Sequence, residues 1–141
     1  MAQKLAGLPL TIVGDGNQER DFIYVTDVAE AFYLAAISKF TGQIWNLGSG
    51  KPIKVNYLAS LINDKVTYIP HRPGEPNTTH ADISKIRKDL DFEPRVQIEE
   101  GIKKILINIK DYESQTIWTP SSIEKATINW FKNLGENRIN E

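Results

Sequence analysis

Two arginines in this sequence stand in segments whose backbone is restrained. Arg20 follows a glycine-rich turn at residues 14–16, and Arg72 lies in residues 70–77, which hold three prolines. A guanidinium group presents a planar fork of donors that fits two phosphate oxygens, and it keeps its charge at physiological pH. A side chain on restrained backbone loses less entropy on binding. Both residues are therefore candidates for binding a phosphate or diphosphate group.

A carboxylate and a short strand complete the candidate set. Glu75 follows the second arginine in the same stiff loop, where it could accept hydrogen bonds from two neighbouring hydroxyls. Thr11, Ile12 and Val13 form a strand-like run whose backbone N–H and C=O groups could meet the edge of a planar ring. Simpler interpretations stay open: each arginine could pair with a nearby carboxylate such as Asp21 or Glu75, and Glu75 could be a solvated loop residue.

Alternating strands and helices must position these residues. Strands are predicted at residues 10–13, 22–25, 43–47 and 66–69. Helices are predicted at residues 28–38, 58–62, 83–90, 98–112 and 121 to about 134, the last with Ser121 and Glu124 as a capping pair and Gly135 at its end. The first residues are typical of the last turn of a helix that ends at Gly7, so we expect the chain to begin inside an element. The predicted fold is mixed α/β, of the α+β kind.

Other conspicuous residues favour structural roles. Asp27 is predicted to cap a helix rather than to act in catalysis. His71 and His80 have no partners at metal-ligand spacing. We expect residues 48–50, Gly-Ser-Gly, to form a turn that borders the bound molecule. The aromatic residues near the C-terminus, Trp118, Trp130 and Phe131, are expected to pack the last helix onto the core.

The composition limits the class of protein. The sequence has 141 residues, a net charge of -1 and no cysteine. A single domain over residues 1–135 with a disordered tail at 136–141 is the simplest organisation. No apolar run approaches the ~20 residues of a membrane span, and the balanced charge argues against nucleic acid as a partner. Without cysteine the chain forms no disulfide and no thiolate zinc site, which fits a cytoplasmic protein.

Three segments in order resemble a known family. They are residues 10–29, LTIVGDGNQERDFIYVTDVA, residues 46–50, NLGSG, and residues 71–85, which begin HRPGEP and end ADISK. Together they resemble the C-terminal half of the extended short-chain dehydrogenases that act on nucleotide sugars, the UDP-glucose 4-epimerase group and its dehydratase and decarboxylase relatives. The resemblance covers about residues 5–110. It implies the substrate-binding lobe of such an enzyme, with a small sheet and about five helices, lacking the Rossmann core.

The resemblance gives the candidate residues roles. In the family, arginines that match Arg20 and Arg72 bind the diphosphate, and an acidic residue that matches Glu75 binds the ribose hydroxyls. The strand of residues 11–13 would then lie against the base. The implied ligand is a UDP- or TDP-sugar, and the resemblance does not specify which sugar.

The family also needs two features that this sequence does not contain. One is a Gly-x-x-Gly-x-x-Gly turn that seats the NAD pyrophosphate, and the other is a Tyr-x-x-x-Lys pair in which the lysine lowers the tyrosine pKa. No residue is therefore predicted to be catalytic, to bind a cofactor or to bind a metal. The chain is expected to be inactive alone, with NAD bound by a missing Rossmann half. Two alternatives stay open: a free-standing nucleotide-sugar-binding module, and a remnant whose apolar faces form a homo-oligomer.

Overall fold

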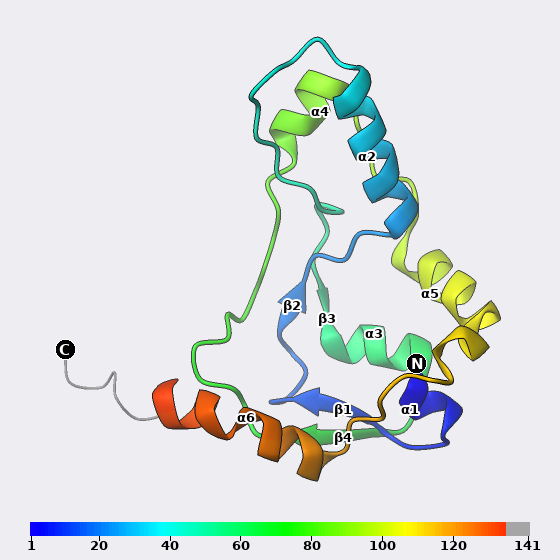
Figure 1. Cartoon of the computed structure of the whole chain (residues 1–141), viewed down its shortest axis with the longest axis vertical. Coiled ribbons are helices and arrows are strands. Elements are labelled where there is room, and N and C mark those ends of the chain that lie inside the picture. The colour runs from blue at the N-terminus through cyan, green and yellow to red at the C-terminus, as the bar shows by residue number, and fades with distance from the viewer. Residues whose placement is uncertain (135–141) are drawn as a thin grey trace.

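The chain folds into a narrow upper part and a broader lower part (Figure 1). The computed structural model describes residues 1–134, and the elements within them are α1 (Ala2–Leu5), β1 (Leu10–Val13), β2 (Glu19–Arg20), α2 (Val25–Ile37), β3 (Ile53–Lys54), α3 (Val55–Ile62), β4 (Val66–Ile69), α4 (Ser84–Leu90), α5 (Ile98–Ile107), a 3-10 helix η1 (Ile109–Tyr112) and α6 (Pro120–Leu134). None of these helices is long and apolar enough to cross a membrane. The mixed α/β class is confirmed, with six α-helices in the described residues.

The lower part is built on a parallel pair of strands. β1 pairs with β4 in a register that sets Leu10 opposite Val66 and ends with Val13 opposite Ile69. Parallel strands need a crossover connection, and α3 lies within it. Leu10 and Ile12 of β1 are buried together with Ala59 of α3, so the helix covers one face of the strand pair.

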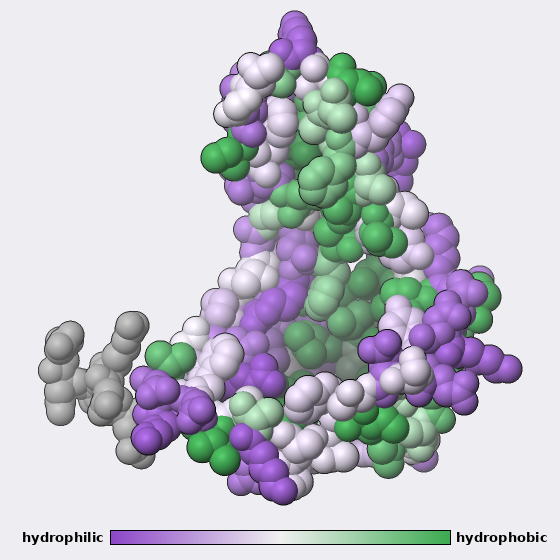
Figure 2. All heavy atoms as spheres, in the orientation of Figure 1, coloured by the Kyte–Doolittle hydropathy of each residue, from purple (hydrophilic) through white to green (hydrophobic). Residues whose placement is uncertain are grey.

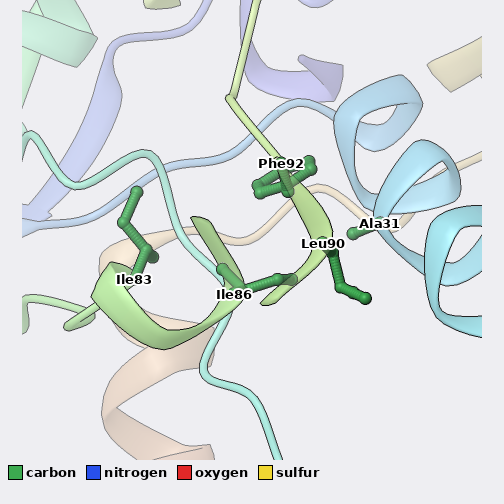
Figure 3. Close-up of a cluster of buried hydrophobic side chains, with 5 residues drawn as sticks. All are labelled: Ala31, Ile83, Ile86, Leu90 and Phe92. Atoms are coloured by element: carbon green, nitrogen blue, oxygen red, sulfur yellow. The ribbon is translucent and has the colours of Figure 1, made fainter. Parts of the chain in front are cut away.

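The upper part is a small helical core. Ala31 of α2 is buried against residues of α4 and the segments beside it, namely Ile83, Ile86, Leu90 and Phe92 (Figure 3). Phe92 is 1% exposed and is the largest fully buried side chain of the described residues. A phenylalanine buried this completely contributes about 2–3 kcal/mol, so one ring anchors much of this core.

A short antiparallel pair connects the two parts. β2 pairs with β3, with Glu19 opposite Lys54 and Arg20 opposite Ile53. The predicted small sheet is thus two separate two-stranded ladders, β1 with β4 and β2 with β3. Arg20 stands at the end of β2, between the upper and lower parts (Figure 1).

Two predicted strands are wrong. Strands were expected at residues 22–25 and 43–47, but these segments form no ladder, and α2 already begins at Val25. Their composition favours a strand, yet a strand needs a neighbour to bond with, and the described part of the chain puts none beside them. The strands at residues 10–13 and 66–69 are confirmed because they find each other.

Helix positions are confirmed, but several predicted helix ends are wrong. The long helix expected over residues 98–112 stops at Ile107 and continues as η1 after Asn108, a residue type that competes with helical hydrogen bonds. The last helix begins at Pro120, where Thr119 and Ser122 exchange hydrogen bonds in place of the expected Ser121 and Glu124 pair. The predictions for Gly135 and for the tail at 136–141 lie outside the described residues.

Asp27 is not a helix cap, as the sequence pattern had suggested. It lies in the first turn of α2, is 3% exposed, and accepts hydrogen bonds from the backbone N–H groups of Arg95 and Val96 at 3.1 and 3.0 Å. A buried carboxylate needs such donors, because leaving it unpaired costs several kcal/mol. Asp27 therefore joins α2 to the segment that leads into α5, a contact that only the fold creates.

Candidate functional site

Arg20 contacts the loop of residues 70–77 directly. Its Nη2 donates to Glu75 Oε1 at 3.1 Å, and its Nη1 donates to the carbonyl oxygens of Glu19 at 2.7 Å and Asn77 at 3.4 Å. The side chains of Arg20 and Glu75 are only 21% and 24% exposed. The fold therefore brings together two of the predicted site residues that are 55 positions apart in sequence.

Glu75 uses one carboxylate oxygen for Arg20. Its other oxygen, Oε2, is buried and accepts no hydrogen bond from the residues that the structure describes. An ionised carboxylate can accept several hydrogen bonds, so Oε2 is an acceptor in need of a donor. Ion pairing with Arg20, the simpler interpretation of both residues, is real but leaves half of the carboxylate for another group.

Arg72 faces a different neighbour. Its guanidinium lies over the ring of Trp130 in α6, with Cζ 6.0 Å from the ring centroid, and it forms no ion pair with the described acidic residues. The indole Nε1 of Trp130 donates to the carbonyl of Pro73 at 2.9 Å. Arg72 also lines a pocket of about 360 Å³ together with Thr11 of β1 and Thr127 of α6.

The strand β1 presents one edge away from β4. The backbone N–H groups of Leu10 and Gly14 donate to carbonyls of Lys65 and Ile69 on the β4 side. Because backbone groups alternate between the two edges of a strand, those of Thr11 and Val13 point to the opposite edge. Ile12 is 3% exposed and serves the core. Of the predicted run, Thr11 can thus offer its backbone groups to a ligand, and Val13 can offer its N–H, because the Val13 carbonyl accepts from Gln18 Nε2 at 2.8 Å.

Asp21, next to Arg20, joins its own segment to residues 49–50 and to Ala81. Its carboxylate accepts from the N–H of Ser49 at 2.7 Å, of Gly50 at 3.0 Å and of Ala81 at 3.2 Å, and from the Ser49 hydroxyl. Burial alone would raise the pKa of Asp21, but these donors outweigh it and hold the pKa below its ordinary value. The turn at residues 48–50 is therefore hydrogen-bonded to Asp21, the residue that directly follows β2 and Arg20.

Close packing explains why a glycine occurs in this turn. A Cβ on Gly48 would lie 2.6 Å from both the Ala81 Cβ and the Asp21 Oδ2. Any side chain at this position would push the carboxylate away from its donors. The absence of a side chain at Gly48 thus allows the Asp21 contacts to form.

The turn before β2 is also held in place. Gly16 has a φ of 74°, in the left-handed region that favours glycine, and a Cβ there would lie 2.0 Å from Asn56 Oδ1. Asn56 donates its side-chain amide to the Asp15 carbonyl at 2.9 Å and its backbone N–H to the Gly16 carbonyl at 3.0 Å. This agrees with the expectation that Arg20 follows restrained backbone.

The histidines do not form a metal centre. In residues 1–134, no three His, Cys, Asp or Glu residues come close enough to hold a metal ion. His71 lines a pocket of about 480 Å³ with Gly14 and Gln18, and His80 Nε2 lies 3.2 Å from the Gly50 carbonyl. His71 is thus a surface residue beside a pocket, and His80 makes an ordinary hydrogen-bonding contact.

Two residues of this region were given other roles by the sequence. Trp130 was expected to pack α6 onto the core, and that expectation is wrong, because the side chain is 44% exposed and contacts the arginine loop. Asp21 was considered only as an ion-pair partner for arginine. Its partners Ser49 and Gly50 lie 28 and 29 positions away in the sequence, so no local signal marks either Asp21 or Trp130.

Known proteins match this chain over most of its length. The model of the GDP-mannose 4,6-dehydratase family matches residues 1–105. UDP-glucuronate 4-epimerase of Thermodesulfobacterium geofontis is 38% identical over 103 residues, which are 68% of this chain and 32% of that protein. dTDP-glucose 4,6-dehydratase of Salmonella typhimurium is 28% identical, covering 95% of this chain and 40% of that protein. The chain spans about a third to two fifths of the length of these relatives.

Solved structures agree with the sequence matches. UDP-glucose 4-epimerase of Thermotoga maritima, solved with UDP-glucose, superposes with a TM-score of 0.71 at 32% identity, over 78% of this chain and 37% of that one. UDP-glucuronic acid 4-epimerase of Bacillus cereus, solved with UDP-glucuronic acid and NAD, gives 0.72 at 31% identity, over 78% and 38%. By sequence and by fold, this chain belongs to the GDP-mannose 4,6-dehydratase family of NAD-dependent epimerase/dehydratase-like proteins.

Proposed function

We propose that this chain supplies the nucleotide-sugar-binding surface of an epimerase or dehydratase and does no redox chemistry alone. The observation that carries the proposal is the Arg20–Glu75 contact, which joins a held strand end to the loop of residues 70–77 and leaves Glu75 Oε2 buried without a donor. In this assignment Arg20 and Arg72 bind the diphosphate, and Glu75 accepts the ribose hydroxyls.

The charges suit that ligand. A diphosphate carries negative oxygens on two phosphorus atoms, and two guanidinium groups on one loop and its contact strand supply matching donors. Arg20 keeps the Glu75 carboxylate in place, and Oε2 is the oxygen left to accept from a ribose hydroxyl, which would reach it once the side chains that bury it move aside. The outward N–H and C=O of Thr11 and the outward N–H of Val13 would accept and donate at the edge of a uracil-like or thymine-like base.

The residues do not fit a seat for NAD. Such a seat needs a glycine turn that opens a helix, but the residues preceding the described α-helices are Met1, Tyr24, Lys54, Ile83, Gln97 and Thr119. The sequence also lacks a tyrosine followed four positions later by lysine. We therefore assign no hydride or proton step to this chain and place the cofactor on another portion of the enzyme.

One face of α2 supports a contact with such a portion. Six apolar side chains, none of them contributing to the core, lie on the same side of the helix at helical spacing: Val25, Ala29, Phe32, Tyr33, Ala36 and Ile37. Figure 2 shows apolar surface gathered over the upper part and the hollow below it. The nearby segments 22–24 and 43–47 have strand-like sequences without a strand partner in the described residues, so they offer backbone groups as well. We assign this surface, the α2 face, to the NAD-binding portion.

Calorimetric titration tests the proposal. The 141-residue chain should bind UDP, TDP or UDP-glucose with millimolar or better affinity, and Arg20→Ala and Arg72→Ala should each weaken binding by roughly tenfold or more, because each removes a charge-assisted contact. Arg87→Ala is the matched control, since Arg87 pairs with Glu93 at 2.8 Å on another surface. Absence of binding by the unaltered chain, or equal losses in all three variants, would contradict the assignment.

A further inference from the structure

The last helix, α6, is attached to the surface rather than buried in a core. No residue of α6 is buried, although the helix has 15 residues. Its polar contact with the rest of the chain is the Trp130 Nε1 donor to the Pro73 carbonyl at 2.9 Å, beside the Arg72 guanidinium over the same ring. A helix with these contacts gains little from hydrophobic burial. The helix instead contacts the loop of residues 70–77, which carries Arg72.

The segment before α6 is linked through Gln3 to β1, the strand that is predicted to contact the nucleotide base. Gln3 donates its side-chain amide to the Trp118 carbonyl at 2.8 Å and to the Thr11 hydroxyl at 3.2 Å. Residues Ile123, Ala126 and Thr127 of α6 then form one wall of the 360 Å³ pocket that Thr11 and Arg72 also line. Residues 118–134 therefore contact the loop that carries Arg72 and line a pocket with the strand β1.

The two arginines are held in chemically different ways. Arg20 spends Nη2 on a carboxylate and Nη1 on two carbonyls. Arg72 lies over an aromatic ring, and a ring attracts a guanidinium through its face while leaving the in-plane N–H donors available. Such a contact restricts a long flexible side chain without using the groups that bind phosphate.

We propose that Trp130 is a positioning residue, which holds Arg72 and the loop of residues 70–77 in the conformation that binds a diphosphate. The proposal rests on the proposed function for Arg72. The family model ends at residue 105, so Trp130 lies outside the residues that this model matches, although the match to dTDP-glucose 4,6-dehydratase of Salmonella typhimurium covers 95% of the chain. Trp130 acts through Arg72 and the Pro73 carbonyl and does not itself touch the ligand.

The test uses the full chain with Trp130→Ala and Trp130→Phe, and UDP as the probe. Hydrogen exchange of peptides that cover residues 70–77 should be faster in Trp130→Ala, and the affinity for UDP should fall by roughly fivefold. Trp130→Phe keeps an aromatic face but loses the donor to Pro73, so it should recover a large share of the affinity while the loop still exchanges faster. Ile128→Ala is the control, because Ile128 is a 57% exposed apolar residue of the same helix.

A second comparison separates positioning from general stability. In an Arg72→Ala background, Trp130→Ala should cause a smaller further loss of UDP affinity, because the part of its effect that passes through Arg72 is already absent and only the part through the Pro73 carbonyl remains. An equal loss in both backgrounds, or unchanged exchange at residues 70–77, would overturn the proposal. If the unaltered chain binds no UDP, the proposed function fails, while the exchange measurement still decides whether Trp130 orders the loop.

Discussion

The upper and lower parts of the molecule present surfaces of different chemical character. The α2 face exposes Phe32 and Tyr33 at 71% and 63%, with no charged residue among its six members. The end of β2 and the loop of residues 70–77, below the upper part, carry Arg20, Arg72 and Glu75, which are partly buried and held by specific partners. Exposed apolar side chains gain by excluding water over a broad contact, whereas fixed charges gain by meeting a small ligand of opposite charge.

We propose that this difference lets one chain contact two kinds of partner. A broad apolar face suits another folded surface, and the charged loop suits a nucleotide sugar. Asp21 stands between them, bonded to Ser49 and Gly50 on one side and to Ala81, which packs against the upper core, on the other. The two parts depend on the same carboxylate, so they are predicted to unfold together.

The largest expected effect comes from this junction. Asp21→Ala removes an acceptor that serves three backbone N–H groups and one hydroxyl, and should lower the free energy of unfolding by about 3 kcal/mol. Urea unfolding followed by circular dichroism measures this. Asp15→Ala is the control, because among the described residues the Asp15 carboxylate is hydrogen-bonded only within its own turn, to Asn17. Equal stability of the two variants, or an upper part that unfolds separately, would break the comparison.

A smaller effect is expected on association. With its apolar α2 face uncovered, the chain should sediment as a dimer or larger species, and Phe32→Glu should weaken self-association at least tenfold, about 1.4 kcal/mol. UDP binding should not change, because Phe32 lies in the upper part. Ile128→Glu places the same charge on α6 and should leave association intact. A monomer over a wide concentration range would remove the evidence that the α2 face seeks a partner.

The smallest effect concerns acid. The folded pKa of Asp21 is held below its ordinary value, so its contribution to stability is complete above the unfolded pKa of roughly 3.9 and is lost as the pH falls through the lower folded value. Stability measured between about pH 6 and about pH 3 should therefore fall less steeply in Asp21→Asn than in the unaltered chain. Parallel pH profiles of the two proteins would show that the stabilising contacts of residue 21 do not depend on the charge of Asp21.

Local patterns predicted much of the secondary structure. The strands at residues 10–13 and 66–69, the helix predicted at residues 28–38 and the stiff loop at 70–77 follow from alternation, helical spacing and proline, all of which act within a few residues. The two wrong strands share one cause. Residues 22–25 and 43–47 have strand-like composition, but pairing depends on what lies beside them, and nothing in the local sequence specifies a neighbour.

The sequence by itself determined the family and the identity of the charged residues, because these depend on residue types in a fixed order. Only the tertiary structure decided how those residues are held: that Arg20 meets Glu75, that Asp27 binds Arg95 and Val96, and that Trp130 reaches the arginine loop. The physical reason is distance along the chain. Hydrogen bonds and ring contacts require atoms within a few ångströms. In each of these three cases the partners are 55 or more residues apart in the sequence.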